Sequence, residues 1–329
     1  MPYKDVFIAD WTYTGTSTIS GKDNYTVIKG GDIEIYRSIF KYPHLKLNAD
    51  GNILMRGVTF QNFGSRSKSH LFLDSNETII VKDCDLYAPG YNLVVIGTNS
   101  RPKKIIFDNM RFGVPATQQC VQILGVADNC EILFRNVRGY SASNFLRLSN
   151  RHNATGIKLS FYNSHLGIYP TSDAKKYPFW NGLLNFDDYT SNTLEECLAN
   201  NQHGRDKVSV KFVNCQYWTS DTRPITPDMQ WCDKNKTPES YVNNEEEGIG
   251  YVYFEKVYDG TNLTSGQLEY TEENAQYFPS VSIEYNGYGT IGYKGVPQIV
   301  TEEYNEEWGT VIPGGNIEGP TMEEEDGEW

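Results

Sequence analysis

Short apolar strands recur along the first two thirds of the chain. Each begins with alternating apolar and polar residues and runs into a Gly, Asp or Asn, and the start positions are Val27, Ile53, Ile79, Ile105, Ile132, Leu159 and Val210. The aligned turn residues are Gly30, Gly57, Asp83, Asn109, Asn136, Asn163 and Asn214. Their successive separations are 27, 26, 26, 27, 27 and 51 residues. A repeat near 26 residues is typical of a solenoid.

The columns of the aligned repeats predict which side chains face the interior. Two residues before the turn stand Ile28, Met55, Val81, Phe107, Phe134, Phe161 and Phe212. The column between the apolar columns reads Lys29, Arg56, Lys82, Asp108, Arg135, Tyr162 and Val213. Because alternate residues of a strand face opposite sides, we expect the first column in the core and the second in solvent.

A second short strand lies between successive repeats, at 44–49, 70–75, 92–97, 120–125, 144–149 and 182–187. Gly, Asp and Asn tolerate a left-handed backbone, so the turn column is expected to bend the chain sharply. A coil of this size cannot bury its apolar side alone, and stacked coils would pair equivalent strands about 4.8 Å apart. The sequence therefore predicts an all-β parallel β-helix with Asn109, Asn136 and Asn163 stacked at successive bends.

The Asn turn column and the strands around it resemble the pectate-lyase-like superfamily over about residues 25–220. That resemblance implies a right-handed parallel β-helix. The segments "KDCDLY" and "FVNCQYW" are also similar to pectate-lyase-like domains of gut Bacteroidetes proteins.

Three regions are expected. Residues 1–24 would form an N-terminal cap or attachment segment, residues 25–222 the β-helix with an insertion at 170–206, and residues 223–329 an acidic β-rich region that ends in a flexible tail. Charge changes near the second boundary: residues 1–238 hold 27 bases and 22 acids, whereas residues 239–329 hold 2 bases and 20 acids.

Basic residues gather on the expected outer face. Arg135 and Arg138 share one repeat without an acid, and Arg111 and His165 occupy the same column as Arg138 in neighbouring repeats. Lys82 and Asp85, and Asp108 and Arg111, are expected to neutralise each other within a repeat. The remaining Arg residues form either an ordinary solvated face or a site for an anionic glycan, because Arg binds carboxylate and sulfate through two hydrogen bonds.

The insertion at 170–206 adds aromatic residues and a short expected helix from 191 or 192 to 200. Tyr177 and Trp180 could stack on sugar faces, with Asp187 beside them, or they could cap the local core.

The sequence lacks a complete set of catalytic residues. A lyase of the resembled superfamily would use acids to hold calcium and an Arg or Lys as base, and Asp85, Asp108, Arg111 and Arg138 do not include the clustered carboxylates that calcium needs. Six scattered cysteines favour neither a disulfide scaffold nor a metal site. We therefore expect no metal and no cofactor, with calcium relevant only if the protein is a lyase, and we favour a non-catalytic protein over a polysaccharide lyase or glycoside hydrolase.

Two functions fit these observations. The first is a bacteriophage virion component, such as a tail spike, tail fibre or capsid-associated protein, which partners other virion subunits or itself and could bind a host-surface polysaccharide. The absence of a recognisable secretory signal favours this setting, since virions leave the cell by lysis. The alternative is a bacterial polysaccharide lyase, hydrolase or glycan-binding protein, secreted or on the cell surface. The net charge of −13 argues against nucleic acid, and no segment is apolar enough to insert into a membrane.

The acidic end has a feature that a solvated tail does not need. Within residues 299–313, Tyr304, Trp308 and Ile312 interrupt the acids. We expect this segment to pack onto a basic surface of a neighbouring subunit or partner protein.

Overall fold

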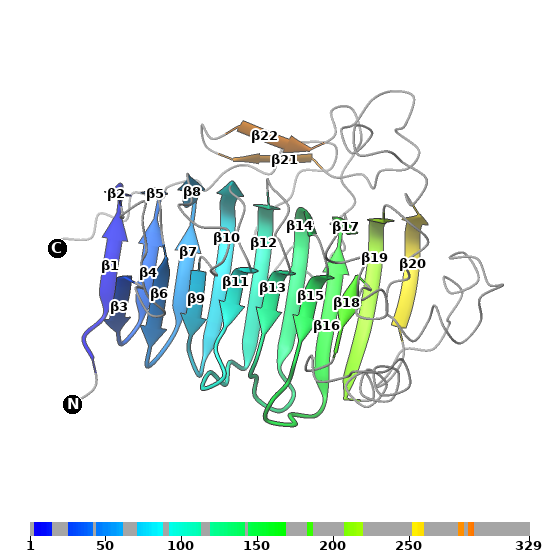
Figure 1. Cartoon of the computed structure of the whole chain (residues 1–329), viewed down its shortest axis with the longest axis horizontal. Coiled ribbons are helices and arrows are strands. Elements are labelled where there is room, and N and C mark those ends of the chain that lie inside the picture. Colours follow the sequence, from blue (N-terminus) through cyan, green and yellow to red (C-terminus); the bar gives the residue numbers. More distant parts are fainter. Residues whose placement is uncertain are drawn as a thin grey trace, which may run out of the picture.

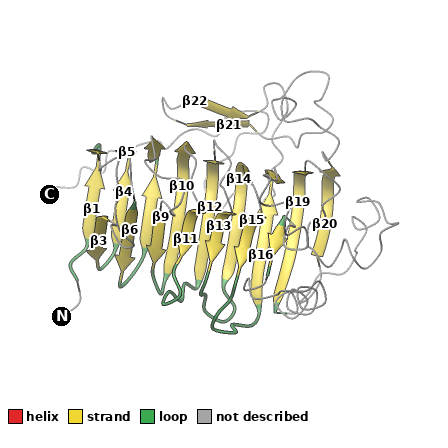
Figure 2. Cartoon of the chain, viewed as in Figure 1, coloured by secondary structure: helices red, strands yellow, loops and turns green. Residues whose placement is uncertain are grey.

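The chain is a parallel β-helix in its described part. The computed structural model describes residues 3–14, 26–41, 44–61, 71–87, 92–112, 119–141, 144–168, 183–186, 207–219, 252–259, 282–285 and 289–292. These residues form strands and turns and contain no helix (Figure 2). The predicted all-β solenoid with coils about 26 residues apart is confirmed.

Two parallel sheets line the coils, with sheet A in front and sheet B behind in Figure 1. One wall of sheet A consists of β1 (Val6–Ala9), β4 (Ile33–Tyr36), β7 (Ile53–Arg56), β10 (Thr78–Tyr87), β12 (Lys104–Phe112), β14 (Glu131–Ser141), β16 (Ile157–Tyr162), β19 (Val208–Thr219) and β20 (Val252–Asp259). A second arm of sheet A contains β2 (Thr12–Thr14), β5 (Ile39–Lys41), β8 (Thr59–Gln61), β17 (His165–Ile168) and the far halves of the long strands. Sheet B consists of β3 (Thr26–Gly30), β6 (Leu45–Ala49), β9 (Leu71–Asp74), β11 (Asn92–Ile96), β13 (Gln119–Ile123), β15 (Asn144–Leu148) and β18 (Leu184–Asn185).

A single left-handed residue separates the two arms of sheet A in each coil. Its φ is +53° at Asp83, +53° at Asn109, +54° at Asn136, +48° at Asn163 and +65° at Gly57. The register skips this residue, so that Lys82 pairs with Asp108 and Cys84 pairs with Met110 on either side of it. The predicted stack of Asn bends is confirmed, and we call this line of residues the bend.

The sequence analysis aligned the first repeat wrongly with the later repeats. Gly30 ends β3 in sheet B, and the bend of that coil is Arg37, with a φ of +45°. Asp10, with a φ of +54°, is the bend of a still earlier coil. The stack therefore begins at β1, before residue 25. An Arg at the bend breaks the Gly, Asp and Asn pattern, which is why alignment by residue type selected Gly30 instead.

The core is a continuous apolar column between the sheets. Phe107, Phe134, Phe161 and Phe212 lie in register on β12, β14, β16 and β19. Their ring centroids are 4.9, 4.9 and 4.6 Å apart, with interplanar angles of 17°, 13° and 8°. The predicted stack of phenylalanines is confirmed. Directly after the bend, the thiols of Cys84 and Cys215 are fully buried, as small core residues were expected to be.

Gly139 shows how closely the second arm packs. A Cβ atom on this residue would lie 2.8 Å from Cδ2 of Phe112 and 3.0 Å from Cε2 of Phe145. Those two rings make an edge-to-face contact with centroids 5.7 Å apart. The Gly in "RNVRGYS" therefore leaves room for aromatic packing between coils.

The outer face of sheet A is not the solvated face that strict alternation predicted. Ile106, Leu133, Tyr162 and Val213 point away from the core yet are at most 6% exposed, and they pack together with Ile80. The signal was present in the sequence as paired apolar residues such as Ile105–Ile106 and Ile132–Leu133. Two adjacent strand residues cannot both face the core.

Further strands lie after residue 222, the predicted end of the β-helix. β20 pairs in parallel with β19 and adds to sheet A. β21 (Ser282–Tyr285) and β22 (Gly289–Gly292) pair antiparallel within the region that the sequence predicted to be β-rich.

Candidate functional site

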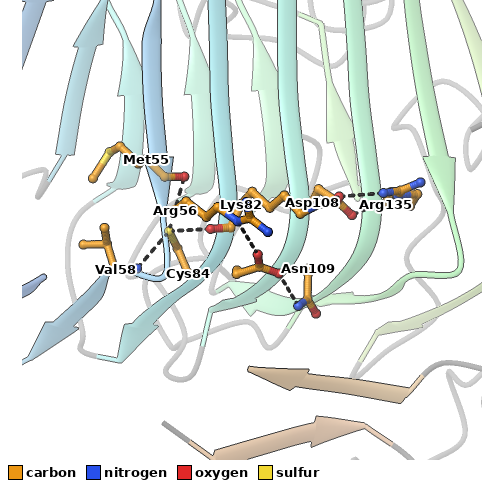
Figure 3. A network of polar contacts seen from close by, with 9 residues as sticks. Met55, Arg56, Val58, Lys82, Cys84, Asp108, Asn109 and Arg135 are labelled. Atoms are coloured by element: carbon orange, nitrogen blue, oxygen red, sulfur yellow. Dashed lines mark hydrogen bonds and ion pairs between the residues drawn. The ribbon is translucent and has the colours of Figure 1, made fainter. Parts of the chain in front are cut away.

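Polar residues gather on the outer face of sheet A along both sides of the bend. The column just before the bend contains Arg56, Lys82, Asp108 and Arg135, which are neighbours in the register. The column two residues after it contains Asp85, Arg111, Arg138 and His165. Sequence analysis placed four candidate residues here, and the structure brings Arg111, Arg135, Arg138 and His165 together. We call these two columns, with Asp83 at the bend, the bend cluster, and Figure 3 shows the column before the bend.

Asp108 is held between two bases from the coils on either side. Nη2 and Nε of Arg135 donate to Oδ2 and Oδ1 of Asp108 at 2.7 and 2.9 Å, and Nζ of Lys82 lies 3.6 Å from Oδ2 (Figure 3). The side chains of Arg135 and Asp108 are 2% and 1% exposed. Arg135 therefore uses its fork to bind a carboxylate of the protein, which makes it a structural residue rather than a ligand contact.

Arg111 and Asp85 form a second pair of this kind. Nε of Arg111 donates to Oδ1 of Asp85 at 3.1 Å, and Nη2 donates to Oδ2. Sequence analysis expected Asp85 to pair with Lys82 and Asp108 with Arg111 inside one repeat, whereas the pairs described here join adjacent coils. Equivalent residues of adjacent coils lie at strand spacing, so these ion pairs run along the solenoid.

Asp83 places a carboxyl group at the bend itself. Nδ2 of Asn109 donates to Oδ1 of Asp83 at 2.6 Å, and Nε of Arg56 lies 3.4 Å from Oδ2 (Figure 3). Burial raises the pKa of Asp83, and the opposing effects of Lys82 and the Asn109 hydrogen bond do not offset it. The buried carboxyl group therefore binds a proton more readily than an exposed one.

His165 lies beside Arg138 in the register and is 4% exposed. Burial, followed by the charge of Arg138, moves the pKa of His165 well below its usual value. The ring is neutral at physiological pH, so it adds no positive charge to the bend cluster.

The bend cluster carries an excess of positive charge. Its bases are Arg56, Lys82, Arg111, Arg135 and Arg138, and its acids are Asp83, Asp85 and Asp108. The side chains of Arg56, Lys82 and Arg111 remain 30%, 18% and 21% exposed. Arg138 is half-buried. An anion could thus approach several bases that are fixed by the sheet.

The thiols near this surface are inert. Cys84, directly after the bend, hydrogen-bonds to the Val58 N–H at 3.4 Å and to the Lys82 carbonyl at 3.0 Å (Figure 3). Burial raises the pKa of Cys84 far above its usual value and the pKa of Cys215 to about 12. A protonated, buried thiol is a poor nucleophile.

Sheet B carries polar residues that sequence analysis did not single out. Asn92, Gln119 and Asn144 form a buried ladder in which the Gln119 N–H donates to Oδ1 of Asn92 at 3.3 Å. At the other end of the strands of sheet B, Nζ of Lys46 lies 2.7 Å from Oδ2 of Asp74. A polar residue at the start of three successive short strands, in "NLVVI", "QCVQI" and "NFLRL", was the available signal.

The other predicted contact residues lie outside the described residues. These are Tyr177, Trp180, Asp187, Tyr304, Trp308 and Ile312, together with the expected helix near 191–200. Of the insertion at 170–206, the structure describes residues 183–186, where β18 pairs with β15 in sheet B.

The described ranges hold no group of three His, Cys, Asp or Glu residues that could bind a metal ion. They also contain no helix with the length and apolar character to cross a membrane.

Comparisons with known proteins assign this chain to no family. The chain matches no protein-family model, no curated protein and no solved structure. The likeness to the pectate-lyase-like superfamily therefore rests on the coil pattern, which establishes a parallel β-helix and no specific family.

Proposed function

We propose that this chain is a non-catalytic structural β-helix that binds an acidic glycan along the bend cluster. The observation that supports the proposal is the excess of bases over acids on adjacent coils, with Arg56, Lys82 and Arg111 partly exposed. Equivalent bases recur at strand spacing, about 4.8 Å, so a long polyanion could contact several coils at once. Arg135 would support this surface from below through Asp108 instead of touching the glycan.

The pairing of the acids supports binding over catalysis. A calcium-dependent lyase needs carboxylates that are available to the ion. Here Asp108 accepts hydrogen bonds from Arg135, and Asp85 accepts hydrogen bonds from Arg111. The oxygens that could ligate calcium therefore already face bases of neighbouring coils.

We further propose that the protein acts in a bacteriophage virion, with other virion subunits or copies of itself as partners. A rigid stack of coils suits a structural role, and the acidic residues 239–329 suit contact with a basic neighbour. The genomic neighbourhood tests this setting: capsid and portal genes beside the gene would support it, and sugar-uptake genes would favour the secreted alternative.

Binding is tested with the full chain and soluble acidic polysaccharides, namely pectate, alginate and chondroitin sulfate, by titration calorimetry at two salt concentrations. Lys82→Gln should weaken binding about tenfold, because it removes one charge-assisted contact. Lys158→Gln is the matched control, since Lys158 is 67% exposed and lies at the opposite end of its strand from the bend. Equal affinity in the two variants would overturn the proposed site.

The lyase alternative makes a distinct prediction. If it were correct, the same polysaccharides would yield ultraviolet-absorbing unsaturated products, and Asp108→Ala or Arg138→Ala would abolish them. We expect no such products with or without calcium.

A further inference from the structure

An apolar strip runs along the outer face of sheet A beside the bend cluster. Three of its residues stand two positions before Lys82, Asp108 and Arg135 on the same strands and the same face, and two more continue the column of Arg135. They pack together, and we call them the outer strip: Ile80, Ile106, Leu133, Tyr162 and Val213. The outer face of sheet A therefore combines an apolar strip with neighbouring bases.

The outer strip is covered, although it points away from the core. Ile106 is 0% exposed and Leu133 is 6% exposed. Neighbours in the same sheet leave the tip of an outward side chain in solvent, so burial on both faces of a parallel sheet indicates a further layer. Because these values hold for one chain by itself, the chain supplies this cover. The bases are covered less completely, since the side chains of Lys82 and Arg111 keep 18% and 21% exposure.

Residues 299–313 have the composition that fits such a surface. Tyr304, Trp308 and Ile312 recur at every fourth position and bring the apolar side chains. Four acids lie between and before them, namely Glu302, Glu303, Glu306 and Glu307. Apolar side chains suit the outer strip, and carboxylates suit the bases beside it.

The chain also tethers this segment near the bend. Figures 1 and 3 draw β21 and β22 on the side of the stack where the strands of sheet A bend. β22 ends at Gly292, and six residues, 293–298, connect it to the segment. A short linker gives a tethered ligand an effective concentration of about a millimolar, which favours the surface of the same chain over that of another molecule.

We propose that residues 299–313 bind the outer strip and the bend cluster of their own chain and compete there with the acidic glycan. The competition rests on the proposed function, whereas the contact itself does not. The apolar side chains of the segment contact the outer strip, and its glutamates face Lys82 and Arg111. If the contact is formed about nine tenths of the time, it lowers the apparent affinity for the glycan about tenfold.

The first test detects the contact in the full chain without any glycan. A zero-length carbodiimide cross-linker joins a carboxylate to an amine that it touches, and mass spectrometry of the digested monomer identifies the linked residues. Lys82 should be linked to glutamates of residues 299–313. Lys158 is the control amine, because it is 67% exposed and lies at the opposite end of its strand from the bend. A mixture of isotope-labelled and unlabelled chains separates links within a chain from links between chains.

The second test measures the competition by titration of pectate, alginate and chondroitin sulfate into full-length variants. Removing the charges of the segment should raise the affinity for the bound polysaccharide about tenfold in the variant with Glu302→Gln, Glu303→Gln, Glu306→Gln and Glu307→Gln. A matched control removes the same number of charges near the end of the chain and should change affinity less than about twofold, through Glu323→Gln, Glu324→Gln, Glu325→Gln and Glu328→Gln. Trp308→Ala should raise affinity without any change of charge.

The two tests separate this inference from the proposed function. Absence of a link between Lys82 and residues 299–313, links only between different chains, or equal effects of the two sets of substitutions would each overturn the contact within one chain. If no variant binds a polysaccharide and the Lys82 link is present, the contact stands and the glycan site is rejected.

Discussion

At the scale of single residues, the position of each side chain relative to the bend decides its environment. The residue two before the bend enters the aromatic stack, as Phe134 does between Phe107 and Phe161. The residue immediately before it points outward into an ion pair, as Arg135 does. The left-handed residue makes both arrangements possible, because it turns the chain without disturbing the register on either side.

Truncating the middle of the aromatic stack should be costly. Phe134 is fully buried and contacts rings on both sides, so Phe134→Ala should lower the free energy of unfolding by about 3–5 kcal/mol. Denaturant unfolding followed by circular dichroism measures this change. Phe134→Leu, which keeps most of the volume, should cost clearly less. A loss below about 1 kcal/mol for the Ala variant would contradict the stacked core.

Asp83 should make stability depend on pH in a defined direction. Because burial raises its pKa in the folded state, the folded protein binds the proton more tightly than the unfolded chain. Ionisation of Asp83 therefore destabilises the fold; this penalty is absent below the unfolded-state pKa, about 3.9, and complete above the folded-state pKa. Asp83→Asn should raise stability at neutral pH and lose this advantage as the pH falls.

The measurement for Asp83 is the difference in unfolding free energy between the two chains from pH 3 to pH 8. A difference that stays constant over this range would show that the carboxyl group titrates normally. Asp50→Asn is a suitable control, because Asp50 is exposed and lies outside the bend cluster.

At the scale of strands, the ion pairs connect equivalent positions of adjacent coils. Asp108 of β12 binds Arg135 of β14 and faces Lys82 of β10. The same coupling appears in the polar ladder of Asn92, Gln119 and Asn144 in sheet B. These side chains bond to the coil before or after their own, so the pairs contribute to the stacking of coils more than to any single coil.

The buried pair of Asp108 and Arg135 should show strong coupling. Arg135→Met removes two hydrogen bonds to the buried carboxylate of Asp108, and Asp108→Asn removes the charge that the guanidinium of Arg135 binds; each should cost about 3 kcal/mol. The double variant should cost clearly less than the two single changes combined. Lys103→Ala, which removes an exposed pair with Glu77, should cost less than about 1 kcal/mol. Additive effects of Asp108→Asn and Arg135→Met would contradict the pair.

At the scale of the whole molecule, charge is divided along the chain. Residues 1–238 are slightly basic and residues 239–329 are strongly acidic, with 20 acids and 2 bases. The bases of the bend cluster belong to the first group. A surface with this charge suits an anionic partner, whether a glycan or an acidic protein segment.

Deleting residues 299–329 tests the expectation for the acidic end. If the segment around Tyr304, Trp308 and Ile312 packs onto a basic surface of a partner or neighbouring subunit, the shortened chain should bind partners more weakly and with a smaller dependence on salt. Pull-down of partners and sedimentation at two salt concentrations measure this. Unchanged assembly and unchanged salt dependence would identify the segment as a solvating tail.

The coil can be predicted from local features of the sequence. The spacing of Asp83, Asn109, Asn136 and Asn163 gave the period, and the phenylalanines two residues earlier gave the inner face, because backbone bending and side-chain alternation are local properties that a single chain displays. The alignment was wrong only at the first repeat, where Arg37 occupies a left-handed position that its type does not signal.

Which charges meet and which faces are covered depends on how the coils stack, and this could not be predicted from the sequence. Residues such as Asp108 and Arg135 are 27 positions apart and become neighbours through stacking, so sequence proximity did not suggest this pair. Outward residues such as Leu133 and Tyr162 are buried even though alternation placed them in solvent. Burial and ion pairing depend on which residues of neighbouring coils face each other. The stacking of the coils sets this arrangement, and the sequence of a single coil does not.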